Sequence, residues 1–231
     1  MEEMVRRSNY TGAKLLITNL KTDKKNVLSP EGILRTFDVS SKRIDAVKKV
    51  YYDTPDFFFR KNGINISTNH YSEKNKDDIT VRYDSSVSRI EFLSNLPDTY
   101  TKKLNKTDSI SKHYNYMATA ILELVPKGLT VDAFEVIQTI KPMLIVTKKR
   151  ERYRVVHNDG LKVVLSFELN TYKSMKTGAK HVMPILDIRM DSPDKFKDAF
   201  KEFVKRLNVQ ETNFIKQKHS DLFIGQEYLE L

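Results

Sequence analysis

Residues 143–154 read Met-Leu-Ile-Val-Thr-Lys-Lys-Arg-Glu-Arg-Tyr-Arg, and this stretch decides the expected fold. An apolar segment runs into a basic segment with no turn residue between them, which is typical of one long β-strand. Because side chains alternate between the two faces of a strand, one face is expected to carry Leu144, Val146, Lys148, Arg150, Arg152 and Arg154. Four like charges in one row repel each other, so this face requires either bulk water or a polyanion in front of it.

Two interpretations of the basic row remain open. In the first, a chain of phosphate groups lies against it, because the guanidinium fork of arginine matches phosphate oxygens in a bidentate way. In the second, the row belongs to an exposed edge strand whose charges prevent pairing with other chains.

Composition restricts the classes of function. The chain has 231 residues, no cysteine and a formal net charge of +10, which fits one domain in a reducing compartment with the cytoplasm as the expected location. The positive charge attracts polyanions such as nucleic acid, nucleoside triphosphates or polyphosphate. No apolar run approaches the roughly 20 residues that span a bilayer, so no membrane partner is expected.

The usual phosphate-binding and metal-binding motifs are missing from the sequence. No glycine-rich loop of the Walker or dinucleotide-binding type occurs, so a phosphate site would have to consist of side chains. The five histidines show no spacing typical of a metal site.

The remaining patterns predict an antiparallel α+β fold. Strands are expected at 13–20, 47–53, 64–71, 79–84, 88–93, 161–170 and 182–190, and helices at 29–37, 113–125 and 193–207. Residues 97–112 are expected to form a loop. Together with the basic strand, this gives an eight-stranded β-barrel or tunnel with surrounding helices, in one domain over residues 1–231 with a helical insertion near 97–140. The charged strand faces would line a water-filled interior, or in the alternative would form the outside of a sandwich.

The order of these segments resembles the CYTH family, the triphosphate tunnel metalloenzymes. Residues 50–56, Val-Tyr-Tyr-Asp-Thr-Pro-Asp, followed by a glycine and a strand, are similar to one family segment, and residues 148–155 are similar to its basic strand. Further similarities lie in the hairpin before Glu168, in the strand at 185–189 and in residues 216–223. The resemblance implies a β-tunnel that binds triphosphate and a catalytic divalent metal.

The sequence departs from the family pattern where the metal would bind. The family's E-x-E-x-K motif is replaced by Ala-Lys-Leu-Leu-Ile-Thr at 13–18, and its second acidic pair by Asp187-Ile188-Arg189. Its arginine-bearing strand becomes Ile-Asn-Ile-Ser at 64–67. Magnesium requires hard oxygen ligands, and an arginine at this position would repel it.

These features favour a protein that binds a triphosphate or another phosphate-rich polyanion inside a basic tunnel whose catalytic metal site is degraded. Expected ligands are tripolyphosphate, a nucleoside triphosphate or thiamine triphosphate. The candidate phosphate-binding residues are Arg82, Arg89, Lys148, Arg150, Arg152, Arg154, Arg189, Lys216 and Lys218.

Two alternatives stay open. In an active triphosphate hydrolase, Glu91, Glu168 and Asp187 would hold Mg²⁺ or Mn²⁺, which would neutralise charge on the transferred phosphoryl group. In a non-catalytic interaction scaffold, the partner would be a protein or RNA.

Overall fold

The structure of the chain is a computed structural model, and its described part is discontinuous. It comprises residues 4–6, 11–16, 34–35, 37–74, 76–83, 94–95, 98–105, 108–124, 138–156, 160–190, 198–199, 202, 221, 225 and 229. Every structural statement below concerns these residues.

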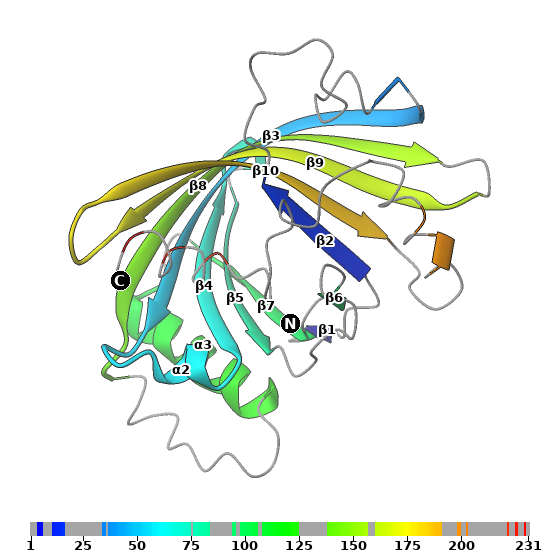
Figure 1. Ribbon diagram of the computed structural model, residues 1–231. Coiled ribbons are helices and arrows are strands. Elements are labelled where there is room, and N and C mark those ends of the chain that lie inside the picture. The colour runs from blue at the N-terminus through cyan, green and yellow to red at the C-terminus, as the bar shows by residue number, and fades with distance from the viewer. Residues whose placement is uncertain are drawn as a thin grey trace.

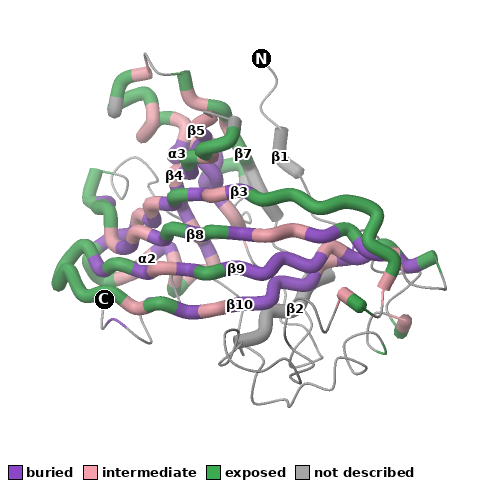
Figure 2. Tube along the Cα trace, turned by 90° about the horizontal axis from the view of Figure 1, so that it is seen from above, coloured by how far each residue is buried: buried purple, intermediate pink, exposed green. Residues whose placement is uncertain are grey.

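One antiparallel sheet dominates the fold (Figure 1). Its strands are β1 (Met4–Arg6), β2 (Thr11–Leu16), β3 (Asp38–Asp53), β4 (Ile64–Tyr71), β5 (Lys76–Tyr83), β6 (Ser94–Asn95), β7 (Asp98–Leu104), β8 (Lys141–Val156), β9 (Lys162–Ser174) and β10 (Lys180–Met190). Their order across the sheet is β1-β7-β5-β4-β3-β8-β9-β10-β2-β6. The long strands β3, β8, β9 and β10 run side by side through its middle (Figure 2).

The sheet is strongly curved, as the expected tunnel requires, but the described residues do not form an eight-stranded closed barrel (Figure 1). The described residues form ten strands, because the short strands β1 and β6 extend the two ends of the sheet. No ladder joins β1 to β6, so backbone pairing among the described residues does not close the sheet.

Several predicted elements are confirmed and one is wrong. The basic segment is a single strand, β8, and the segment at 64–71 is β4 with the predicted bounds. The loop expected at 97–112 instead contains β7, whose residues pair with β5, for example Thr99 with Arg82. Pairing with a neighbouring strand decided this conformation, and the polar composition of the segment concealed it. The strand expected at 88–93 lies outside the described residues.

Helices cover one face of β4 and β5. The helix α3 (Ile110–Leu124) and the single-turn helix α2 (Phe58–Lys61) lie on the outer side of these strands (Figure 1). The hydrophobic core between these helices and the sheet contains Phe59, Ile64, Ile66, Ile79, Val81, Met117, Ala118, Ala120, Ile121 and Ile140. None of the helices in the described part of the chain combines the length and the apolarity needed to cross a bilayer.

Asp53 shapes the turn that follows β3. Its buried carboxylate accepts hydrogen bonds from the backbone N–H groups of Thr54 at 2.8 Å, Phe59 at 3.0 Å and Arg60 at 3.1 Å. Burial nevertheless raises the pKa of Asp53 to about 6, because desolvation outweighs these hydrogen bonds. The aspartate of the Tyr-Tyr-Asp-Thr segment therefore holds the turn into α2.

Candidate functional site

The register of the sheet gathers charged residues on the face opposite α2 and α3, called here the inner face. Arg150 of β8 lies opposite Asp45 on one side and Glu168 on the other. Arg152, one step further along the same face, lies opposite Ser166, which in turn pairs with Asp187 of β10. Because directly paired residues share a face, side chains from four strands converge there.

One end of the inner face is closed by packing. Tyr51, Leu144, Val146, Tyr172, Met183, Ile185 and Leu229 form its apolar cluster. Next to this cluster, the buried Asp221 accepts hydrogen bonds from the Tyr51 hydroxyl at 2.6 Å and from Lys148 Nζ at 2.7 Å. Burial, and then the negative charge of Asp221, raises the pKa of Tyr51 and of Tyr172 well above the ordinary range. Both tyrosines therefore remain neutral donors.

The middle of the inner face is a layer of buried ion pairs. Arg150 Nε donates to Asp45 Oδ1 at 2.5 Å, and both side chains are less than a tenth exposed. Lys148 Nζ lies 3.7 Å from Glu168 Oε2. The internal carboxylates therefore offset much of the repulsion that the sequence predicts for the basic row.

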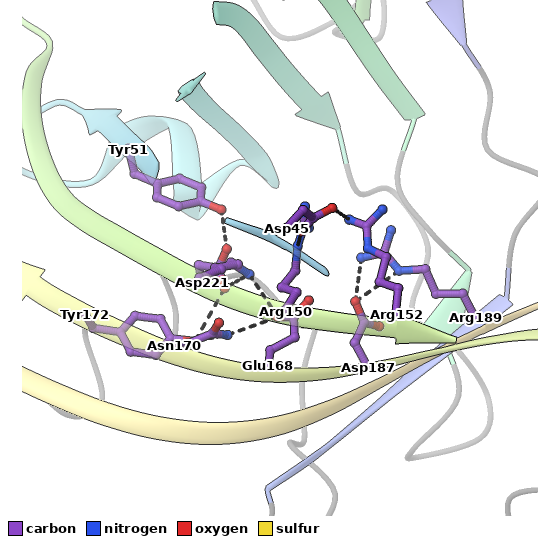
Figure 3. A network of polar contacts seen from close by, with 11 residues as sticks. Asp45, Tyr51, Arg150, Arg152, Glu168, Asn170, Tyr172, Asp187, Arg189 and Asp221 are labelled. Carbon is purple, nitrogen blue, oxygen red and sulfur yellow. Dashed lines mark hydrogen bonds and ion pairs between the residues drawn. The ribbon is translucent and has the colours of Figure 1, made fainter. Parts of the chain in front are cut away.

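The other end is half exposed and rich in arginine (Figure 3). Arg152 Nη2 lies 3.8 Å from Asp45 Oδ2, and the Arg152 side chain remains 34% exposed. The Arg189 side chain, 39% exposed, donates from Nη2 to Asp187 Oδ2 at 2.6 Å. The pKa of Arg152 is lowered by partial burial and by repulsion from Arg150 and Arg189, although Asp45 opposes these effects. Like charges are therefore held close together here.

Exposure increases along β8 from the closed end to the open end. Lys148 is 4% exposed and Arg150 is 8% exposed, whereas Arg154 is classed as exposed. On the opposite face of β8 exposure falls in the same direction. Lys149 is exposed there, whereas Tyr153 is 7% exposed and packs edge-to-face on Phe167. The inner face thus opens toward solvent between Arg150 and Arg154.

A fourth arginine, Arg82 of β5, shares the inner face, because it pairs with Asn65, which stands two residues before Ser67, the partner of Tyr51. Burial raises the pKa of Tyr71 on β4, and three arginines oppose that rise: Arg82 of β5 and both Arg150 and Arg152 of β8. The positive charges of Arg82 and of the two β8 arginines therefore all lower the pKa of Tyr71, although β5 and β8 are separated by two strands in the sheet. We call Arg82, Arg150, Arg152 and Arg189 the arginine cluster.

Two of the carboxylates expected to hold a metal, Glu168 and Asp187, are engaged by cationic side chains here. Asp187 holds Arg189 at 2.6 Å, and Glu168 faces the Lys148 ammonium group. On β2, the backbone register places Lys14 opposite Asp187 and Gly12 opposite Arg189, so neither position supplies an acid. Among the described residues no group of three or more histidine, aspartate or glutamate side chains is placed to hold a metal ion.

The structure brings seven of the predicted site residues together on the inner face, namely the arginine cluster, Lys148, Glu168 and Asp187. Arg154 lies at the exposed end of β8, while Arg89, Glu91, Lys216 and Lys218 lie outside the described residues. Sequence reasoning missed Asp45 and Asp221. Asp45 stands two residues before the predicted strand at 47–53. Extending the alternation of that strand backwards would have placed Asp45 on the same face as Val47. Asp221 carries no periodic signal that identifies it.

Comparison with known proteins supports the fold rather than a sequence relationship. No protein-family model and no curated protein matches the chain. The structure is similar to that of HpAC1 from Hippeastrum, an adenylyl cyclase candidate described as having a dominant triphosphatase activity, with a TM-score of 0.58, 12% identity and coverage of 94% of this chain and 95% of that one.

A second similar structure is an adenylate cyclase candidate from Bacillus halodurans, with a TM-score of 0.51, 12% identity and coverage of 96% and 98%. A third is the PH1819 protein from Pyrococcus horikoshii, with a TM-score of 0.50, 13% identity and coverage of 94% and 99%. At these identities the similarity establishes architecture alone. With a curved antiparallel sheet, a charged inner face and these structural neighbours, the chain has a CYTH-like fold.

Proposed function

We propose that the protein binds a triphosphate or a similar phosphate-rich anion at the arginine cluster, without a catalytic metal. The observation that carries this proposal is the charge balance at the open end of the inner face. Four guanidinium groups lie on the inner face, and the carboxylates beside them among the described residues are Asp45, Glu168 and Asp187. The remaining positive charge suits an anionic ligand.

The ion pairs prepare the site for such a ligand. Asp45 anchors both Arg150 and Arg152, and Asp187 anchors Arg189, so the guanidinium groups are held in place before a ligand arrives. Preorganised donors lose little conformational entropy on binding. Arginine also matches phosphate oxygens through paired N–H groups. The proposed ligands are tripolyphosphate, a nucleoside triphosphate or thiamine triphosphate.

The state of the carboxylates supports binding over hydrolysis. A divalent ion at Asp187 would have to displace an arginine that this carboxylate already holds. Arg189 would supply positive charge in place of a metal, a role that suits a guanidinium group beside phosphate. The metal-dependent triphosphatase remains the competing function, and the activity described for HpAC1 motivates its test.

Thermal unfolding with tripolyphosphate, in the presence and absence of Mg²⁺ or Mn²⁺, tests the proposal. A ligand that binds the native state raises the midpoint by mass action. We expect stabilisation without added metal and no release of phosphate from tripolyphosphate, thiamine triphosphate or nucleoside triphosphates. Metal-dependent release would establish the hydrolase instead. If no phosphate compound stabilises the protein, the result favours the third function, a non-catalytic interaction scaffold.

A further inference from the structure

A further arginine, Arg43 of β3, stands at the open end of the inner face. It pairs in register with Arg152 of β8, so the two side chains share that face. The Arg43 side chain is 44% exposed, whereas Arg150, deeper on the same face, is 8% exposed. Like charges directly opposite each other on neighbouring strands are destabilising, so the pair of Arg43 and Arg152 requires an anion close to it.

Asp45 supplies part of that negative charge. Its Oδ1 atom accepts a hydrogen bond from Arg150 Nε at 2.5 Å. Its Oδ2 atom lies 3.7 Å from Arg43 Nε and 3.8 Å from Arg152 Nη2, which is too far for a hydrogen bond to either group. Asp45 therefore stabilises the two facing arginines by its charge, while the N–H groups of Arg43 donate to another residue.

That residue is Glu73, in the short helix η1 (Ser72–Lys74). Arg43 donates to Glu73 Oε2 from Nε at 3.2 Å and from Nη2 at 2.9 Å. The Ser72 hydroxyl donates to the backbone carbonyl of Ala46 at 3.0 Å, which holds η1 against β3. The Glu73 side chain is 39% exposed, and exposed ion pairs contribute little to stability. A more highly charged anion can therefore replace Glu73 on Arg43.

From this geometry we infer that Arg43 is a further phosphate-binding residue at the open end of the inner face, and that the Glu73 carboxylate occupies its N–H groups until a ligand arrives. This inference rests on the proposed function. Carboxylate and phosphate oxygens accept the same N–H groups of a guanidinium fork. The outermost phosphate group of the bound chain lies between Arg43 and Arg152 and displaces Glu73. The Glu73 carboxylate thus competes with the ligand and lowers its affinity.

Calorimetric titration of the full chain with tripolyphosphate tests the role of Glu73. In Glu73→Gln the competing charge is gone, so affinity should rise about two- to fivefold, as the strength of exposed ion pairs indicates. Glu123→Gln is the matched control, because it removes the same charge from the exposed surface of α3. At a salt concentration of about 0.15 M this distant charge is screened, so the affinity should not change. Unchanged or lower affinity in Glu73→Gln, or an equal gain in both variants, would overturn the inference.

The role of Arg43 is tested in the same titration. Arg43→Gln should weaken tripolyphosphate binding about fivefold, less than the loss of a buried contact, because Arg43 gives up Glu73 when it binds the ligand. Lys48→Gln is the control, since it removes one positive charge from an exposed position on the opposite face of β3. Equal losses in the two variants would mean that net charge alone matters, which contradicts the inference.

A double variant shows whether Glu73 acts through Arg43. Glu73→Gln added to Arg43→Gln should bring no gain in affinity, because the competing carboxylate then has no guanidinium group to occupy. A gain as large as in the parent would contradict the inference. Both positions are exposed, so these variants should keep the thermal midpoint of the parent. Failure of the parent to bind tripolyphosphate would instead refute the proposed function, so the two failures are distinguishable.

Discussion

Asp187 Oδ2 accepts two hydrogen bonds from Arg189, which stands two residues further along the same strand, at 3.0 Å from Nε and 2.6 Å from Nη2. Asp187 is the first cause of the raised pKa of Arg189, so this guanidinium group stays protonated over the whole accessible pH range. An acid that resembles a metal ligand in the sequence thus serves to orient a cation. This pairing is one of the grounds for the anion site without a metal that we propose.

Arg152 should contribute directly to anion affinity. Arg152→Ala removes a half-exposed guanidinium group while Asp45 keeps its bond to Arg150. Because hydrogen bonds to charged groups contribute about 1.5–3 kcal/mol, tripolyphosphate affinity should fall roughly 10- to 100-fold in calorimetric titration. Arg154→Ala, which removes the same charge at the exposed end of β8, is the control and should change affinity much less. Equal effects of the two variants would show that only net charge matters.

Asp45 should be essential for stability. Asp45→Asn leaves the buried Arg150 without its anionic partner, which should lower the free energy of unfolding by about 3–5 kcal/mol in urea. Asp38→Asn, an exposed change on the same strand, should have an effect within about 0.5 kcal/mol. Adding Arg150→Gln to Asp45→Asn should recover part of the loss, because the buried charge is then gone. Strict additivity of the two changes would contradict a direct ion pair.

The packing of α3 can be tested with adjacent residues. Ile121 is 1% exposed in the core beneath the helix, whereas Leu122 is 56% exposed. Ile121→Ala should lower the free energy of unfolding by about 2–5 kcal/mol, since it leaves a cavity, and Leu122→Ala should change it by less than about 0.5 kcal/mol. Comparable losses for both variants would show that α3 does not bury Ile121 against the sheet.

Asp53 should give the protein a distinctive pH dependence. Its pKa is raised from 3.8 to about 6, so its protonated form is favoured by folding. The stability that this preference provides is fully present below about pH 4 and is lost as the pH rises through 6, a change on the order of 3 kcal/mol. Urea unfolding of the parent and of Asp53→Asn between these pH values should show the difference, because the variant has no titratable group at this position. Parallel profiles of unfolding free energy against pH for the two proteins would refute the raised pKa of Asp53.

The sequence predicted the elements whose conformation is favoured both by the local residue pattern and by long-range packing. Alternation in the basic strand identified the inner-face positions up to Arg152, and the spacing of apolar residues identified α3 within three residues of its start. The strand β7 escaped prediction, since its polar residues form a strand through pairing with β5. The number of strands and the absence of a closing ladder in the described part of the sheet depend on long-range pairing that no local window contains.

By itself the sequence determined that four cations share one strand face and that the family's acidic motif is missing. Only the tertiary structure decided how those charges are neutralised. Asp45 lies 105 residues from Arg150 along the chain, and Asp221 lies 73 residues from Lys148. The curvature and register of the sheet bring these partners within hydrogen-bonding distance. Spacing along the chain can show which charges stand in a row, but the carboxylates that meet them are selected by contacts between distant segments.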